Sequence, residues 1–205
     1  MLGLPKSTEM SKQLPKKAVY AKFHLNTAAK EKIDADISKI TIVNEVTPDK
    51  IHVPAGEHVS GIFVLHVMLK RGEFDVKTIE TLFKLIPQNI LFVLEYEGKS
   101  KLAIYHINLL QTDWQPTDQC HVELRGLSFD KIWENLICDV GGLSLKAGNT
   151  LDEQILAEAQ KQKLGKEIAR LEKQARTERQ PKKKFEMVQS VKKLTKKLNT
   201  LEELK

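Results

Sequence analysis

The sequence predicts an α+β fold, in which helices pack on a mainly antiparallel sheet and a helical tail follows. Between residues 18 and 142, the patterns run in the order strand, helix, strand, strand, helix, hairpin, strand, helix. Beyond residue 150, apolar residues recur at the heptad spacing of helices that wrap one another. The predicted parts are an N-terminal arm (1–17), an α+β core domain (18–142), a hinge (143–149) and a basic helical tail (150–205).

The first 37 residues predict an arm, a strand and a helix. Residues 1–17 hold two Pro-Lys steps and little periodicity, which indicates an arm with one helical turn between Ser7 and Gln13. Residues 18–25 alternate weakly in polarity and predict a first strand. Asn26 is a good N-cap residue, so we expect an amphipathic helix over residues 28–37.

Two strands and a helix form the predicted centre of the core domain. Residues 39–46 are rich in β-branched side chains and predict a strand, and the proline-containing stretch after them predicts a loop. Residues 60–70 are apolar at both alternating positions, as in an interior strand. Asp75 caps the helix that follows, and Pro87 ends it.

A tight hairpin is predicted next. Residues 89–97 and 101–110 read as strands on either side of Gly98-Lys99, because glycine readily supplies the positive φ of a two-residue turn. This turn would place Phe92 opposite Tyr105 as a cross-strand aromatic pair.

The core domain is expected to end with a strand and a helix. Residues 121–125 predict the strand. Ser128 starts the helix and Gly141-Gly142 end it. The apolar stripe of this helix consists of Phe129, Ile132, Trp133, Leu136 and Ile137.

The net charge of +6 belongs to the tail. Residues 150–205 contain 15 basic and 9 acidic residues, whereas the other 149 residues contain 18 of each. A localised positive segment is typical of proteins with an acidic partner, often nucleic acid. The alternative is a solvated helical face that keeps the chain soluble.

Two heptad seams run along the tail. Each covers only about two heptads, and isolated helices of that length are marginal in water. Each seam therefore needs a partner, which is the other tail helix in an αα-hairpin, a second copy of the chain, or another protein. Pro181 lies between the seams and favours a turn there. The seam residues are Leu164, Ile168, Leu171 and Ala175, followed by Met187, Val191, Leu194, Leu198 and Leu201.

Basic residues crowd the junction between the two tail segments. In a hairpin they would lie at its end, where they could contact a phosphate backbone without reading its sequence and with a strong dependence on salt. Phe185 is the single aromatic residue among them, so base stacking is not indicated. A solvated turn is the alternative. The residues concerned are Arg176, Arg179, Lys182, Lys183 and Lys184.

Catalytic and metal-binding signatures are absent from the sequence. It contains no G-x-G-x-x-G, Walker A or G-x-S-x-G motif, and its histidines lack the spacing of zinc sites. We therefore predict no catalytic residue, no metal ligand and no cofactor. The triplet Glu95, Glu97 and Lys99 resembles the E-x-K of metal-dependent nucleases, but a solvated hairpin end explains it equally well. His66 lies among apolar residues and is expected to be a hydrogen-bonded core residue.

The compartment expected from the sequence is the cytoplasm. The longest apolar run, residues 62–69, is far too short to cross a bilayer. Lysines interrupt the first 17 residues, unlike a signal peptide. Two cysteines, Cys120 and Cys138, do not form a disulfide framework typical of secreted domains.

Four stretches give the chain a family resemblance, namely LPKKAVYAKF (14–23), KIDADISKITIVNEV (32–46), FKLIPQNILFVLE (83–95) and KLAIY (101–105). The chain resembles a bacterial family catalogued as a domain of unknown function. Genes of that family lie beside helicases and DNA methyltransferases in restriction-like or phage-defence loci. The resemblance implies no catalytic residues.

The expected function combines the resemblance with the tail. We expect a non-catalytic accessory subunit of a DNA-acting restriction-modification or phage-defence complex. Its tail seams would dock onto a larger protein such as a helicase or DNA methyltransferase, and its basic junction would contact DNA. The alternatives are a divergent metal-dependent nuclease and a structural protein that forms a homo-oligomer through its tail.

Overall fold

The computed structural model describes residues 2–145 and 150–203, and it divides the chain into two compact units. The first unit is Met1–Leu143 and the second is Ser144–Lys205. Of the predicted hinge at 143–149, residues 146–149 lie outside the described residues.

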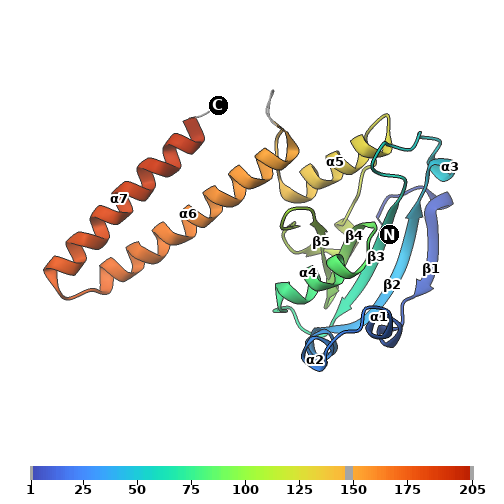
Figure 1. Ribbon diagram of the computed structural model, residues 1–205, viewed down its shortest axis with the longest axis horizontal. Coiled ribbons are helices and arrows are strands. Elements are labelled where there is room, and N and C mark those ends of the chain that lie inside the picture. Colours follow the sequence, from blue (N-terminus) through green and yellow to red (C-terminus); the bar gives the residue numbers. More distant parts are fainter. Residues whose placement is uncertain (1, 146–149, 204–205) are drawn as a thin grey trace. The chain divides into compact units, whose positions relative to one another are not determined.

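The first unit is an α+β domain, as predicted (Figure 1). Its strands are β1 (Glu9–Gln13), β2 (Ile37–Val46), β3 (Ile62–Leu69), β4 (Asn89–Tyr96), β5 (Lys99–Tyr105), β6 (Leu109–Gln111) and β7 (Gln115–Pro116). Its helices are α1 (Lys16–Lys22), α2 (Thr27–Asp36), α3 (Pro48–Ile51), α4 (Val76–Leu85) and α5 (Phe129–Gly141), with short 3₁₀ turns at η1 (Lys6–Thr8) and η2 (Thr117–Gln119).

Within the described residues, seven strands form one sheet in the order β1-β2-β3-β4-β5-β6, and β7 pairs with β5. The β3–β4 pair is parallel, and the other pairs in the described part of the sheet are antiparallel. A parallel pair needs a crossover connection, which α4 supplies here. The prediction of a mainly antiparallel sheet is confirmed.

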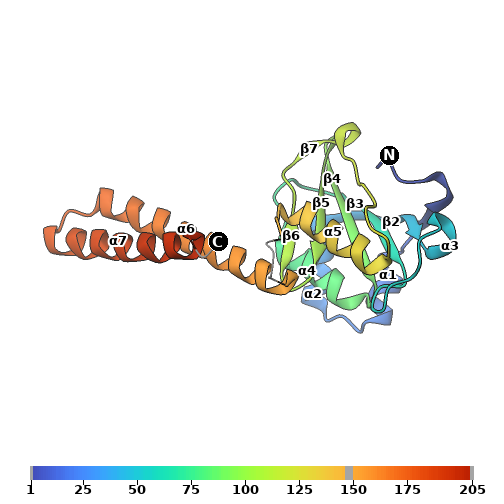
Figure 2. The ribbon, with the colours of Figure 1, turned by 90° about the horizontal axis from the view of Figure 1, so that it is seen from above.

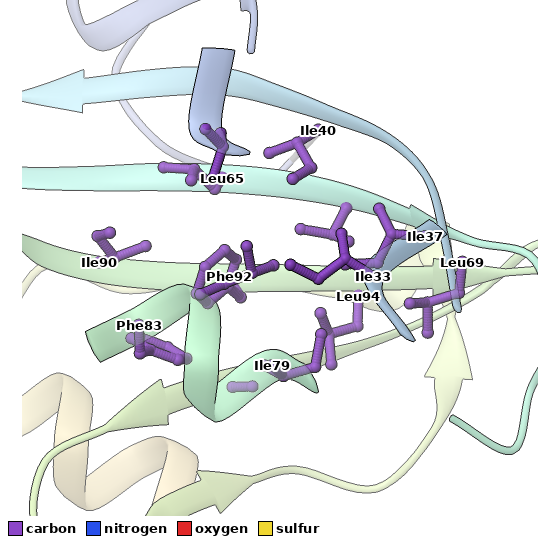
Figure 3. Packing of buried hydrophobic residues seen from close by; sticks show 14 residues of the cluster. Ile33, Ile37, Ile40, Leu65, Leu69, Ile79, Phe83, Ile90, Phe92 and Leu94 are labelled. Atoms are coloured by element: carbon purple, nitrogen blue, oxygen red, sulfur yellow. The ribbon is translucent and has the colours of Figure 1, made fainter. Parts of the chain in front are cut away.

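One face of the sheet packs against α1, α2 and α4. Figure 3 shows this core, in which Ile33 of α2 and Ile79 of α4 lie over Phe92 and Leu94 of β4. The rings of Phe83 and Phe92 meet edge to face with centroids 4.3 Å apart. Asn26 caps α2 and Asp75 caps α4, as predicted, because each side chain accepts a backbone N–H of the first turn.

The opposite face of the sheet lies under α5 (Figures 1 and 2). Alternate residues of the central strands, such as Val64, Val93 and Ile104, are buried on this face. The predicted α5 stripe is buried throughout, and Ser128 caps the helix as expected. The strands β3 and β4 therefore have apolar residues on both faces, which explains why residues 62–69 are apolar at both alternating positions except at His66.

The N-terminal predictions were wrong in two places. Residues 9–13 form the edge strand β1 instead of part of an arm with a helical turn, because they pair with β2. A hydrogen bond from Nδ2 of buried Asn44 to Oγ1 of Thr8 (2.9 Å) fixes the start of this strand. Residues 16–22 form α1 instead of a strand. Pro15 fixes a φ of −64° at its start, and Val19 is buried against the sheet.

The hairpin register also differs from the prediction. Glu97 and Gly98 form the turn, with φ values of 46° and 75°, so Tyr96 pairs with Lys99 and Phe92 faces Ala103. Both turn residues have positive φ, as two-residue hairpins commonly require. Tyr105 packs instead near Phe83, with centroids 6.0 Å apart.

Two predicted strands have different boundaries or none. The strand predicted at 101–110 is two strands, because the chain reverses after Tyr105 and β6 pairs back onto β5. Residues 121–125, predicted as a strand, belong to no helix or strand. The backbone N–H of Val122 donates a hydrogen bond to the carbonyl of Leu2 (2.9 Å). This bond holds the segment in place although it does not pair with a strand of the sheet.

The second unit consists of α6 (Leu151–Thr177) and α7 (Pro181–Glu203). Thr150 and Glu153 form a reciprocal capping box at the start of α6. The two helices pack side by side along their length in both Figure 1 and Figure 2. Of the arrangements left open by the sequence, the αα-hairpin is the one present in this structure.

Candidate nucleic-acid and docking surfaces

A three-residue link turns the chain between α6 and α7. Glu178 ends α6, and its backbone N–H donates to the carbonyl of Gln174. Its carboxylate accepts the backbone N–H of Gln180 at 2.9 Å, close to the start of α7. Pro181 is the first residue of α7, where its missing N–H costs no helical hydrogen bond. The turn is therefore short, and the backbone N–H groups of Glu178 and Gln180 both have hydrogen-bond partners nearby.

The five predicted nucleic-acid-binding residues lie together at this turn and form a surface that we call the basic tip. Each is exposed, and none makes an ion pair with another described residue. The structure thus brings them together at one end of the hairpin. Their cationic groups are free to contact an anion. The residues are Arg176, Arg179, Lys182, Lys183 and Lys184.

Four more lysines extend the positively charged surface of the basic tip. They were not among the residues predicted from the sequence. Lys192, Lys193, Lys196 and Lys197 are exposed along α7, on the side of the helix away from α6, and we call them the basic face. At 1.5 Å per residue, the distance from Lys182 to Lys197 along the axis is about 22 Å. Their arrangement as two i, i+4 pairs was the signal that could have identified them, because residues four apart share one side of a helix.

Phe185 lies beside the basic tip and is 64% exposed. On a helical wheel it falls between Lys182 and Lys192, on the outward side of α7. Val188, one turn further along α7, is 38% exposed. The sequence alone did not indicate base stacking, whereas an exposed aromatic ring beside cations is a surface on which an unpaired base can stack.

The predicted docking seams face each other inside the hairpin. In α6, Leu164 is buried and Ile168 and Leu171 are half-buried. The α7 residues Met187, Val191, Leu194, Leu198 and Leu201 are all half-buried. Two helices can enclose only one side of each seam, so the outer edges of these side chains remain accessible.

The family of this chain follows from comparison with known proteins. The family described as a domain of unknown function (DUF4391) matches residues 2–198. The chain belongs to the DUF4391 family. No curated protein and no solved structure matches it. The DUF4391 match covers both compact units, so the hairpin is part of the family's domain.

The E-x-K triplet of this DUF4391 chain is not gathered into a metal site. Glu95 is bound by His66, whose Nε2 lies 2.6 Å from Oε2 of Glu95. Glu97 is in the hairpin turn with a positive φ, and Lys99 begins the next strand. No cluster of three or more His, Cys, Asp or Glu side chains that could hold a metal occurs among the described residues. His66 is hydrogen-bonded, as expected, but it is only part-buried and so is not a core residue.

Both cysteines of the DUF4391 chain are buried free thiols. Desolvation raises the pKa of Cys120 and of Cys138 above the ordinary value, which disfavours the reactive thiolate. In the described ranges, 2–145 and 150–203, no helix has the length and apolar character needed to cross a membrane.

Proposed function

We propose that the chain is a non-catalytic accessory subunit of a bacterial, cytoplasmic complex that acts on DNA. In this proposal the α6–α7 hairpin docks onto a larger protein, a helicase or DNA methyltransferase of a restriction-modification or phage-defence system. The basic tip and the basic face then contact the DNA backbone.

The observation that carries the proposal is the separation of charge on one hairpin. The net charge of +6 lies entirely within residues 150–205. The lysines of the basic face are on the outward side of α7, whereas the seam residues are on the side toward α6. One helix therefore offers a cationic surface to phosphates and an apolar edge to a protein at the same time.

The incomplete burial of the seam supports the docking part of the proposal. No α7 residue with a described side chain is fully buried, although five apolar residues of α7 lie in the seam. A helix from a partner, packed along the groove between α6 and α7, would enclose those edges as in a three- or four-helix bundle.

The test is co-purification from the native host, using the full-length chain and two variants in about 0.5 M salt. At this salt the Debye length is about 4 Å, so charge contacts are screened and apolar docking persists. One variant carries Leu194→Asp and Leu198→Asp in the seam. Its control changes Lys192, Lys193, Lys196 and Lys197 to Gln, which leaves the seam intact.

We expect a DNA-acting protein to be retained by the wild type and by the basic-face variant, and not by the seam variant. Circular dichroism of each variant separates loss of docking from loss of the helices. Retention of the partner by a seam variant with intact helices would contradict docking through the hairpin. Retention of no partner by the wild type would contradict the accessory role.

The half-buried seam also favours a second candidate, a homodimer in which two hairpins form a four-helix bundle. Sedimentation equilibrium distinguishes the two functions, because a homodimer doubles the 23.3 kDa mass without any partner. The Leu194→Asp, Leu198→Asp variant would then be a monomer, and the wild type would retain no second protein.

A further inference from the structure

An apolar groove opens on the first face of the sheet, beside α1. Its volume is about 230 Å³. Its floor is made by Ile42 of β2, Phe63 of β3 and Ile90 of β4, and one wall is made by Ala18 of α1 and by Phe23, which directly follows α1. Every lining residue belongs to the first unit, so the occupancy of the groove is independent of the proposed function of the hairpin.

Short elements leave this part of the sheet uncovered. The helix α1 is only seven residues long and presents the small side chain of Ala18 to the groove. On the other side α4 ends at Leu85, and the chain crosses to β4 through Ile86 and Gln88, which also line the groove. Neither helix extends over the floor, so Ile42 and Phe63 remain partly exposed.

Lys22 is the cationic group in the lining. Its ammonium lies 5.5 Å from the centre of the Phe23 ring, and Phe23 also lines the groove. The cation is thus held against the apolar wall, at a distance typical of cation–π pairs. It forms no ion pair with any described residue. Gln88 contributes the other polar side chain of the lining.

We propose that this groove binds a small amphiphile, an alkyl carboxylate of medium chain length. The alkyl chain would lie on the floor formed by β2, β3 and β4, and the carboxylate would pair with Lys22. The chemistry fits because the groove is apolar except for one cation and one amide at its sides.

The size of the groove favours a small molecule over a segment of a partner protein. At about 230 Å³ it is below the range of pockets for drug-sized ligands, which begins near 300 Å³. A docked amphipathic helix needs a row of anchor positions at i, i+3, i+4 and i+7. This groove is a single hollow between α1 and the segment that leads into β4.

The test measures binding of three probes to the full-length chain by titration followed with ¹H–¹⁵N correlation spectra. The probes are octanoate, octanol and octylammonium, which share a chain and differ in charge. We expect octanoate to bind most tightly and octylammonium least, with shifts centred on the groove residues. In a series of carboxylates from hexanoate upward, each methylene should raise the affinity about fourfold until the groove is full.

Three variants test whether the probes bind in the groove and whether the carboxylate pairs with Lys22. Lys22→Gln should weaken octanoate about fivefold and leave octanol unchanged. Lys17→Gln is the matched control, since Lys17 is an exposed lysine of the same helix that does not line the groove. Ala18→Phe fills the groove from α1 and should abolish binding of all three probes.

The proposal is overturned if no probe binds saturably, if Ala18→Phe leaves binding intact, or if octanol binds as tightly as octanoate. An acidic peptide with one central leucine serves as a fourth probe. If it binds more tightly than octanoate and displaces it, the groove belongs to a protein partner instead.

Discussion

Gly56 and Asp130 are packed so closely that a Cβ atom on Gly56 would overlap the carboxylate of Asp130. The Asp130 carboxylate accepts three successive backbone N–H groups from this loop, those of Glu57, His58 and Val59. A side chain at the start of α5 therefore organises the loop that leads into β3. These hydrogen bonds link residues more than 70 positions apart in the sequence.

The first prediction concerns acid stability. Desolvation raises the pKa of Asp130, but hydrogen bonds from Val59, Glu57 and His58 outweigh it and hold the pKa below the ordinary value of 3.8. A carboxyl with a depressed pKa stabilises the fold above its unfolded-state pKa, and this stabilisation is lost as the pH falls through its folded-state pKa. Asp130→Asn should therefore lower the Tm by several degrees at neutral pH and by much less below about pH 3. Thermal melts of the wild type and the variant over a range of pH measure this difference in Tm, and Asp118→Asn, at an exposed position, is the control. A Tm difference that is equal at all pH values would contradict a stabilising role of the Asp130 carboxylate charge.

The second prediction compares two glycines. Gly56→Ala should lower the free energy of unfolding by about 2 kcal/mol, because its Cβ overlaps Asp130, including the Asp130 backbone nitrogen at 2.7 Å. Gly165→Ala should stabilise α6 by about 0.5–1 kcal/mol, since a Cβ there meets nothing within 4 Å and alanine favours helices. Urea unfolding of the full-length chain measures both. A neutral Gly56→Ala would show that the loop shifts without cost.

The third prediction concerns the hairpin turn between β4 and β5. Glu97 has a φ of 46°, a left-handed conformation that asparagine tolerates better than glutamate. Glu97→Asn should raise the free energy of unfolding by about 0.5 kcal/mol, as measured by urea unfolding. The same change at Glu123, which is exposed and has no positive φ, should have no such effect. A destabilised Glu97→Asn variant would instead show that the hydrogen bond from the Tyr96 hydroxyl to the Glu97 carboxylate outweighs the relief of the left-handed backbone.

The fourth prediction concerns duplex DNA. Changing the four lysines of the basic face to Gln should reduce the slope of log K against log salt by about 0.9 for each phosphate that the variant no longer neutralises. Fluorescence anisotropy with a duplex probe of random sequence measures the slope. A variant with four exposed lysines of the first unit changed to Gln is the control, and an equal effect there would mean that only net charge matters. The control positions are Lys6, Lys12, Lys39 and Lys99.

The fifth prediction concerns single strands. Phe185→Ala should weaken binding of a single-stranded oligonucleotide by roughly 5- to 150-fold, because stacking of one base contributes about 1–3 kcal/mol. Duplex binding should change little, since paired bases are not available to the ring. Val188→Ala, an exposed apolar position on the same helix, is the control. Equal reductions for the two probes would mean that Phe185 acts through the helix and not through stacking.

Strong local signals predicted most of the first unit. The caps Asn26, Asp75 and Ser128 each start a helix as expected, since capping depends on neighbouring residues. Residues 9–13 could not be identified as a strand from their own pattern, because EMSKQ is largely exposed and becomes a strand only by pairing with β2. The hairpin register depended on which two residues adopt positive φ, and Gly98 alone did not settle this.

The candidate surfaces could be predicted only in part, because some of them depend on how the helices and strands pack. The basic tip follows from adjacent charges in the sequence, whereas the basic face requires knowing which side of α7 packs against α6. The apolar groove had no sequence signal, because its lining comes from α1, three strands and the segment after α4. Residues 16–22 would have had to be identified as a helix first.

The length of the hairpin that α6 forms with α7 sets a distance. The 19 residues from Lys182 at the basic tip to Leu201, the last seam residue, correspond to about 28 Å along the helix, close to the length of eight base pairs of duplex. A protein docked at Leu201 and a phosphate bound at Lys182 would be held that far apart, so the hairpin would act as a ruler. Inserting one heptad into each helix would keep the seam in phase and lengthen the ruler by about 10 Å. An enzyme positioned through this hairpin would then meet its DNA about three base pairs further along.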